Sequence, residues 1–214
     1  SAIKIEPRFL YNGDLKASWY FVPGLIGSIV TLVGTLVSAA TILRERDLGT
    51  MDQLLMTPAA VWEILVAKVI PLFTLLMADI LIGIFLSHLF FQIPLGANFI
   101  WFLVASAFYT CISIGAGILL GTLCRSQRQA QLCSFFINIP MIQLSGSVVP
   151  FESMPPFMQF LSSLDPLRYY TLLARSVLLK GTGIDVIWPY LLILLAYAIV
   201  IMGFSINRFR RQLA

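Results

Sequence analysis

The side chains most able to do chemistry in this sequence are one histidine, three cysteines and a single acid within a long apolar run. The histidine is His88, the acid is Asp79, and the cysteines are Cys111, Cys124 and Cys133. Their spacing matches no metal-binding motif, and the sequence has no glycine-rich phosphate loop with a lysine. The sequence therefore predicts neither catalysis, nor ATP hydrolysis, nor a metal site in this chain.

Asp79 is a speculative intramembrane polar site, because a carboxyl group within an apolar span is a functional candidate. Ion coupling would need a second ionisable group at the same depth, and His88 lies nine residues further on. The other interpretation is a structural acid that accepts hydrogen bonds from neighbouring helices. The missing partner favours this second interpretation.

The composition is that of an integral membrane protein. Hydrophobic residues make up 59% of the chain, charged residues make up 11%, and the mean hydropathy is +0.91, whereas soluble domains carry about 25% charged residues. The net charge of +4 does not indicate nucleic-acid binding, because the basic residues are scattered between apolar segments. We therefore expect membrane lipids, and no nucleic acid, among its partners.

Five segments are long and apolar enough to cross about 30 Å of hydrocarbon. They comprise residues 19–43, 63–91, 99–123, 130–149 and 186–206. The sequence therefore predicts an all-α membrane protein with five transmembrane helices. Residues 1–18 are interpreted as the external end of a missing N-terminal region, since the orientation predicted below places them outside the cell.

The polar link at residues 44–58 connects the first two spans. Gly49 predicts a turn, Thr50 and Gln53 fit a capping box, and Pro58 fits the start of the next helix. The positive-inside rule places this link and the C-terminus in the cytoplasm. On these grounds the link is a short amphipathic helix at the membrane surface, with or without a partner.

Two blocks of sequence resemble the membrane subunits of type-2 ABC exporters. The first resembles the coupling helix of that family and consists of Glu45, Arg46, Gly49, Thr50, Gln53, Leu54, Leu55, Thr57 and Pro58, and the second comprises residues 144–181. The resemblance implies a six-helix permease in the bacterial inner membrane, of which residues 19–214 form the transmembrane domain. It also implies coupling to an ABC ATP-binding subunit, which would hold ATP and Mg, and pairing with a second permease copy, identical or related.

The second block is also predicted to form an external, re-entrant helical segment. Apolar residues there are interrupted by breakers, and our candidate external gate consists of Gly146, Pro150, Glu152, Pro155 and Pro156. A helix is predicted over residues 166–180, with Asp165 as its cap and Gly181 as its stop. Arg168 and Arg175 share one face of it, either to attract an anionic head group or to anchor the helix at the interface.

Small residues recur at every fourth position in the first span. They are Gly27, Thr31, Thr35 and Ala39, and a similar column in the third span contains Gly117. Such columns allow helices to approach closely. Internal packing is one interpretation, and the family resemblance makes the column of the first span a candidate dimer seam.

The resulting hypothesis is a transport subunit driven by a separate ATPase, and the alternative is an ion-coupled secondary transporter or channel acting alone. Only one acid lies deep in a span and no inverted repeat is evident, which disfavours the alternative. A pathway lined by apolar side chains would suit an amphipathic drug-like or lipid-like substrate; the candidates are Phe108, Phe135, Phe136 and Met141.

Overall fold

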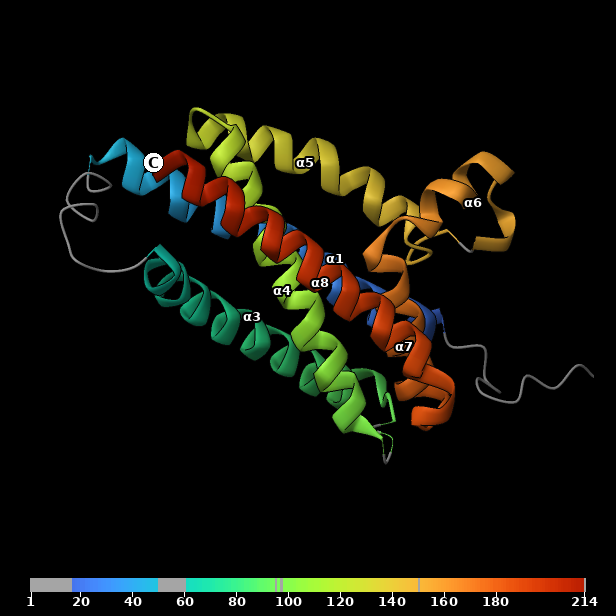
Figure 1. Cartoon of the computed structure of the whole chain (residues 1–214). Coiled ribbons are helices and arrows are strands. Elements are labelled where there is room, and N and C mark those ends of the chain that lie inside the picture. The colour runs from blue at the N-terminus through green and yellow to red at the C-terminus, as the bar shows by residue number, and fades with distance from the viewer. Residues whose placement is uncertain (1–16, 50–60, 95, 97, 150, 214) are drawn as a thin grey trace, which may run out of the picture.

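The computed structural model describes residues 17–49, 61–94, 96, 98–149 and 151–213, and the regular elements in these ranges are all helical. In chain order they are α1 (Ala17–Asp47), α3 (Val61–Phe91), α4 (Phe99–Leu123), α5 (Gln127–Leu144), the short 3-10 helix η1 (Phe151–Ser153), α6 (Pro156–Ser163), α7 (Pro166–Lys180) and α8 (Ile184–Leu213). Figure 1 shows the long helices running side by side, with α6 and α7 at the end opposite the C-terminus.

Four of the described helices are long and apolar enough to span a membrane. These spans are Trp19–Asp47, Trp62–Phe91, Phe99–Leu123 and Ile184–Arg211. The segment predicted at 130–149 forms α5, which begins at Gln127 and ends at Leu144, and it is not among the four. It ends early because the chain turns at Gly146, whose φ is +78°, a left-handed conformation that ends a helix. The fifth span therefore stays a prediction.

Helix α4 lies at the centre of the bundle and contacts α1, α3, α5, α7 and α8. Its contact with α1 is close because Gly117 and Gly121 face the backbone of that helix at Thr35 and Ala39. Nearer the other end, Tyr109 of α4 stacks on Tyr170 of α7 with ring centroids 4.6 Å apart, and both rings are buried. The core is therefore continuous from the long helices into the region of α7.

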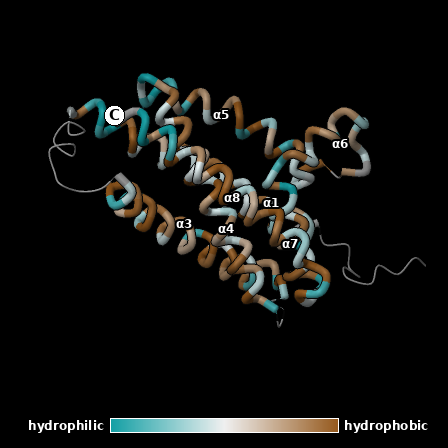
Figure 2. Tube along the Cα trace, in the orientation of Figure 1, coloured by the Kyte–Doolittle hydropathy of each residue, from teal (hydrophilic) through white to brown (hydrophobic). Residues whose placement is uncertain are grey.

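Helix α3 lies at the edge of the bundle and keeps a broad apolar surface. Ile82, Phe85, Leu89 and Phe90 are each more than half exposed. Figure 2 shows α3 coloured as hydrophobic along most of its length. Such a surface suits a helix whose outer face contacts lipid.

The predicted helix over residues 166–180 is α7, with both ends confirmed. The carboxyl group of Asp165 accepts a hydrogen bond from the backbone N–H of Leu167 (2.9 Å), and Pro166 occupies the first helical position. The helix ends at Gly181, whose φ is +62°. Local sequence signals at each end are therefore sufficient to set this element.

Candidate functional site

An ion pair joins α1 to α3, the two helices that flank the polar link. Helix α1 continues past the predicted Leu43 to Asp47, which places Glu45 on the helix, where it pairs with Lys68 of α3. Both side chains are mostly buried, with exposed fractions of 26% for Glu45 and 11% for Lys68. The ammonium group of Lys68 also lies 5.6 Å from the ring centroid of Phe209 in α8. Lys68, which is part of α3, therefore contacts both α1 and α8.

Gly49 forms the turn that the sequence predicts. Its φ is +68°, its N–H donates to the carbonyl of Arg46 (3.2 Å), and an added Cβ would meet nothing within 4 Å. Arg46 lies in the last turn of α1, where a cation complements the helix dipole. The remaining predicted coupling residues lie outside the described ranges: Thr50, Gln53, Leu54, Thr57 and Pro58.

A buried polar network joins α1 to α5 and α4. The hydroxyl of Thr35 accepts hydrogen bonds from Asn138 Nδ2 (2.6 Å) and Ser134 Oγ (3.0 Å), and it donates to the carbonyl of Thr31 (2.7 Å). The hydroxyl of Thr31 in turn bonds to that of Tyr109. The spacing of small residues indicated the two threonines but not their partners. The pairing of Ser134 with Asn138, four residues apart on α5, was the available signal.

The four candidate seam residues pack inside this chain. Thr31, Thr35 and Ala39 are buried, and a Cβ on Gly27 would lie 2.7 Å from the ring of Tyr170. These contacts correspond to the internal-packing interpretation. The apolar residues that α1 leaves exposed are others, among them Phe21, Leu25 and Ile29. The seam itself stays a prediction.

An apolar cavity of about 300 Å³ lies beside the polar network, between α1, α4, α5 and α8. Of the four residues predicted to line a pathway, Met141 lines this cavity, together with Ile112, Leu120, Asn138 and Tyr197. Phe135 lines a different cavity, Phe136 is largely exposed, and Phe108 packs against the core. The cavity combines an apolar wall with a few polar groups, which is the usual character of a site for an amphipathic small molecule.

Asp79 is half-buried in α3, and the described residues offer it no hydrogen bond or ion pair. The hydrogen bonds expected from neighbouring helices are therefore not found there. His88 is turned elsewhere, with Nδ1 at 2.8 Å from the carbonyl of Ile93. Across the described part of the chain, no group of three histidine, cysteine or acidic side chains is placed to hold a metal ion. A role for Asp79 stays untested.

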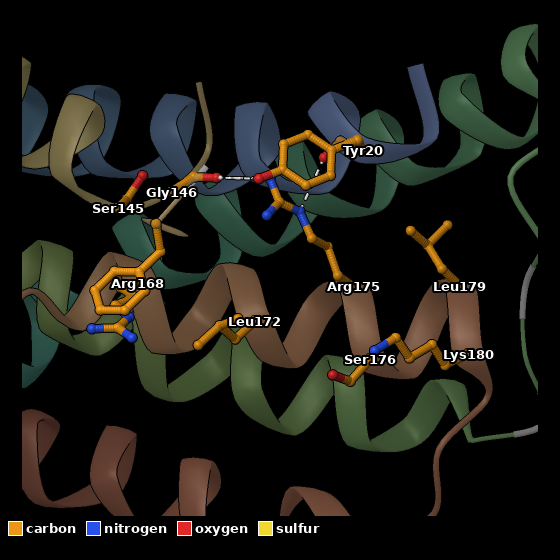
Figure 3. Close-up of a pocket in the computed structure, with 10 residues that line it drawn as sticks. Tyr20, Ser145, Gly146, Arg168, Leu172, Arg175, Ser176, Leu179 and Lys180 are labelled. Carbon is orange, nitrogen blue, oxygen red and sulfur yellow. Dashed lines mark hydrogen bonds between the residues drawn. The ribbon is translucent and has the colours of Figure 1, made fainter. Parts of the chain in front are cut away.

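One guanidinium group joins three segments at the end of the bundle that carries α7. Arg175 on α7 donates from Nε to the carbonyl of Tyr20 (3.0 Å) and from Nη2 to the carbonyls of Gly146 (3.1 Å) and Ser147 (3.4 Å). Its guanidinium carbon also lies 3.6 Å from the ring centroid of Tyr20. Figure 3 shows the side chain reaching from α7 to Tyr20 on α1, whose hydroxyl bonds to the carbonyl of Gly146. Arg175 therefore fastens α7 to α1 and to the turn after α5, a role the sequence did not suggest.

Tyr20, Gly146 and Arg175 also line a cavity of about 350 Å³. Arg168 of α7 lines this cavity and stacks over Phe151. Its guanidinium carbon lies 3.7 Å from the ring centroid. Among the candidate gate residues, Gly146 borders this cavity, while Pro155 and Pro156 cap and begin α6. Pro150 and the side chain of Glu152 lie outside the described residues. A gating role for this segment stays a prediction.

Burial raises the pKa of Asp165 to about 7 from its usual 3.8, against the opposing effects of the Leu167 N–H and the Arg168 charge. The side chain is 4% exposed, and its Oδ2 has no hydrogen-bond partner among the described residues. The folded protein therefore binds this proton more tightly than the unfolded chain. Its contribution to stability is largest below about pH 4 and is lost as the pH rises to about 7.

We expect Asp165→Asn to remove this pH dependence. Asparagine still offers an oxygen to the Leu167 N–H, but it carries no charge to bury. Thermal unfolding of the purified protein should show the variant more stable than the parent at pH 8, by on the order of a few kcal/mol, and equal to it near pH 4. A stability difference that is constant across this range would contradict the prediction.

Span-length apolar helices, a buried polar network and polar ends define this chain as a multi-pass helical membrane protein. The chain belongs to the ABC-2 type transporter family, whose model matches residues 7–179. It is 32% identical over 205 residues to the probable multidrug ABC transporter permease YbhR of Escherichia coli K12, covering 96% of this chain and 56% of the relative. It is also 26% identical over 213 residues to the inner membrane transport permease YhhJ of the same strain. That match covers 99% of this chain and 57% of the relative. The chain thus spans about half the length of the curated relatives it matches.

Proposed function

We propose that this chain is the transmembrane subunit of an ATP-driven exporter and that it couples to a separate ATP-binding subunit through the polar link. The observation that carries the proposal is the Glu45–Lys68 pair. It fastens the end of α1 to the second turn of α3, so the two helices that flank the link form one unit. A partner that displaces the link then moves α1 and α3 together, and Phe209 against Lys68 includes α8 in the movement.

The surface offered to the ATP-binding subunit is the polar link and the last turn of α1. The proposed contacts are Arg46, Gly49, Thr50, Gln53, Leu54, Thr57 and Pro58, while Glu45 acts through Lys68. ATP and Mg belong to the partner subunit. A second permease copy completes the pathway in the bacterial inner membrane, with the C-terminus in the cytoplasm.

The proposed substrate is an amphipathic, drug-like or lipid-like molecule. The cavity of about 300 Å³ supports this class, because its wall is mainly apolar and Tyr109, Asn138 and Tyr197 add isolated polar groups. Two of the relatives are named probable multidrug permeases, which agrees with such a substrate.

We expect the charge reversal Glu45→Lys to uncouple ATP turnover from transport. A partly exposed pair contributes on the order of 1 kcal/mol, so transport per ATP hydrolysed should fall roughly fivefold. The double variant Glu45→Lys/Lys68→Glu should recover most of the loss by restoring the pair. The measurement is efflux of a lipophilic dye and ATP hydrolysis by the full-length permease reconstituted in vesicles with its ATP-binding subunit.

Asp185→Lys provides the control, since Asp185 is exposed in the first turn of α8, outside the polar link, and forms no ion pair within the described ranges. It should leave coupling unchanged. Failure of the double variant to recover coupling would reject the role of the pair. Transport that persists without any ATP-binding subunit would reject the whole proposal in favour of the ion-coupled alternative.

A further inference from the structure

Four arginines converge on one cavity at the end of the bundle that carries the polar link. The cavity has a volume of about 370 Å³ and is lined by Arg46, Arg125, Arg208 and Arg211, which we call the arginine pocket. They come from the end of α1, the α4–α5 connection and the end of α8. Figure 1 shows these three segments meeting at the end marked by the C-terminus, and Figure 2 shows hydrophilic residues gathered there.

Among the residues that the structure describes, no acidic side chain lines the arginine pocket. The ion pair of the described residues at this end, Glu45–Lys68, uses a different cation, and none of the four guanidinium groups makes a hydrogen bond or ion pair within the described ranges. Asp47 follows Arg46 in the sequence but does not line the cavity. Four like charges therefore face one depression without a counter-charge from the chain's described residues.

Helix dipoles compensate only part of this charge. The C-terminal ends of α1, α4 and α8 lie here, and each carries about −0.5 of an elementary charge. The N-terminal end of α5, which begins at Gln127 beside Arg125, adds about +0.5, so the four helix ends sum to about −1 and leave roughly +3 from the four arginines. Capping of helix ends therefore does not account for the whole cluster, and an external anion is the remaining source of compensation.

We propose that the arginine pocket binds the phosphate head group of an anionic membrane phospholipid. Guanidinium groups pair with phosphate oxygens through two parallel hydrogen bonds, so four of them suit two phosphates. A lipid with two phosphodiesters, such as cardiolipin, matches the uncompensated charge best. This inference goes beyond the proposed transport function, which needs no bound lipid.

The position of the pocket favours a lipid over an acidic protein surface. Thr122 and Leu123, the last two residues of the span-length helix α4, line it, and Leu123 is 54% exposed. The pocket therefore lies where hydrocarbon gives way to water, which is the depth of lipid phosphates. Basic pockets at the ends of transmembrane helices are suited to lipids of this kind.

The test measures lipid binding to the detergent-solubilised full-length protein by native mass spectrometry. Cardiolipin should bind more tightly than phosphatidylethanolamine, which has no net charge. The variant Arg125→Gln/Arg208→Gln should weaken cardiolipin binding about thirtyfold, from two lost charges near a lipid surface. It leaves Arg46 intact because the proposed function uses that residue. Both side chains are exposed, and an unchanged gel-filtration profile shows that the fold is retained.

The matched control is Arg128→Gln/Arg210→Gln, which removes the same charge at the same helix ends from two exposed residues outside the pocket. Cardiolipin binding should be little changed. An equal loss in both double variants would show only a diffuse basic surface and would overturn the site. If inorganic pyrophosphate displaces the lipid at equal concentration, the pocket is a site for free anions and the lipid proposal is overturned. Loss of the ATP-binding subunit with unchanged lipid affinity would reassign the arginines to a protein contact.

Discussion

Gly117→Ala is expected to destabilise the bundle by about 3 kcal/mol, at the upper end of what overpacking usually costs. The new Cβ would lie 2.6 Å from the carbonyl oxygen of Thr35 and 2.9 Å from its Cα. Backbone atoms cannot rotate away as a side chain can, so α1 and α4 must separate. Because Thr35 also accepts the hydrogen bonds of Asn138 and Ser134, the separation disturbs the attachment of α5. Denaturant-induced unfolding in detergent micelles measures the loss.

Gly203→Ala on α8 is the matched control, since an added Cβ there would meet nothing within 4 Å. The same substitution in a helix without crowding should stabilise it by about 0.5–1 kcal/mol. Opposite signs for the two variants would show that the column of small residues acts through packing. A Gly117→Ala protein as stable as the parent would mean that α1 and α4 are less closely packed than the contacts require.

Local signals in the sequence were sufficient for much of the helical framework. Helix α4 has the predicted bounds, 99–123, and α7 has the predicted bounds, cap and stop. In each case a long apolar run, or a capping residue followed by proline and later by glycine, determines the element within a few residues of chain. Such signals need no knowledge of what packs against the helix.

The predicted helix ends are wrong where the end of a helix depends on charged residues or on a turn within the predicted span. Helix α1 extends to Asp47 because Arg44 and Arg46 complement its C-terminal dipole, although the polarity of these residues suggests a loop. Helix α5 ends at Leu144, five residues before the predicted end at Val149, because Gly146 adopts a left-handed conformation. Hydropathy alone detects neither effect.

The contacts that build the site join residues far apart in sequence. Glu45 and Lys68 were both visible as charges beside apolar runs, but their pairing requires the relative position of two helices. The clamp of Arg175 on Tyr20 joins residues separated by 155 positions. A single sequence identifies candidate polar residues, and only the packing shows which of them meet.

Arg175→Gln is expected to open the end of the bundle that carries α7, with a loss of about 3 kcal/mol in stability. The variant removes hydrogen bonds from a charged donor, worth about 1.5–3 kcal/mol together with the carbonyls left unpaired, and a cation–π contact worth about 0.5–2 kcal/mol. The carbonyl of Gly146 keeps the bond from Tyr20, whereas that of Ser147 loses its guanidinium donor. Hydrogen exchange should therefore accelerate at the start of α1 and in the turn after α5, while α8 keeps its protection.

Arg168→Gln separates the clamp from the general effect of removing a cation from α7. Arg168 lies on the same face and stacks over Phe151, but it forms no hydrogen bond to the described residues, so its loss should cost only about 1 kcal/mol. Arg175→Lys keeps the charge but not the planar arrangement of donors. The stability of this variant should therefore lie between that of the parent and that of Arg175→Gln. If lysine restores full stability, charge rather than geometry holds α7 to α1. If both glutamine variants accelerate exchange equally, the bonds of Arg175 to Tyr20 and Gly146 are not what fastens α7 to α1.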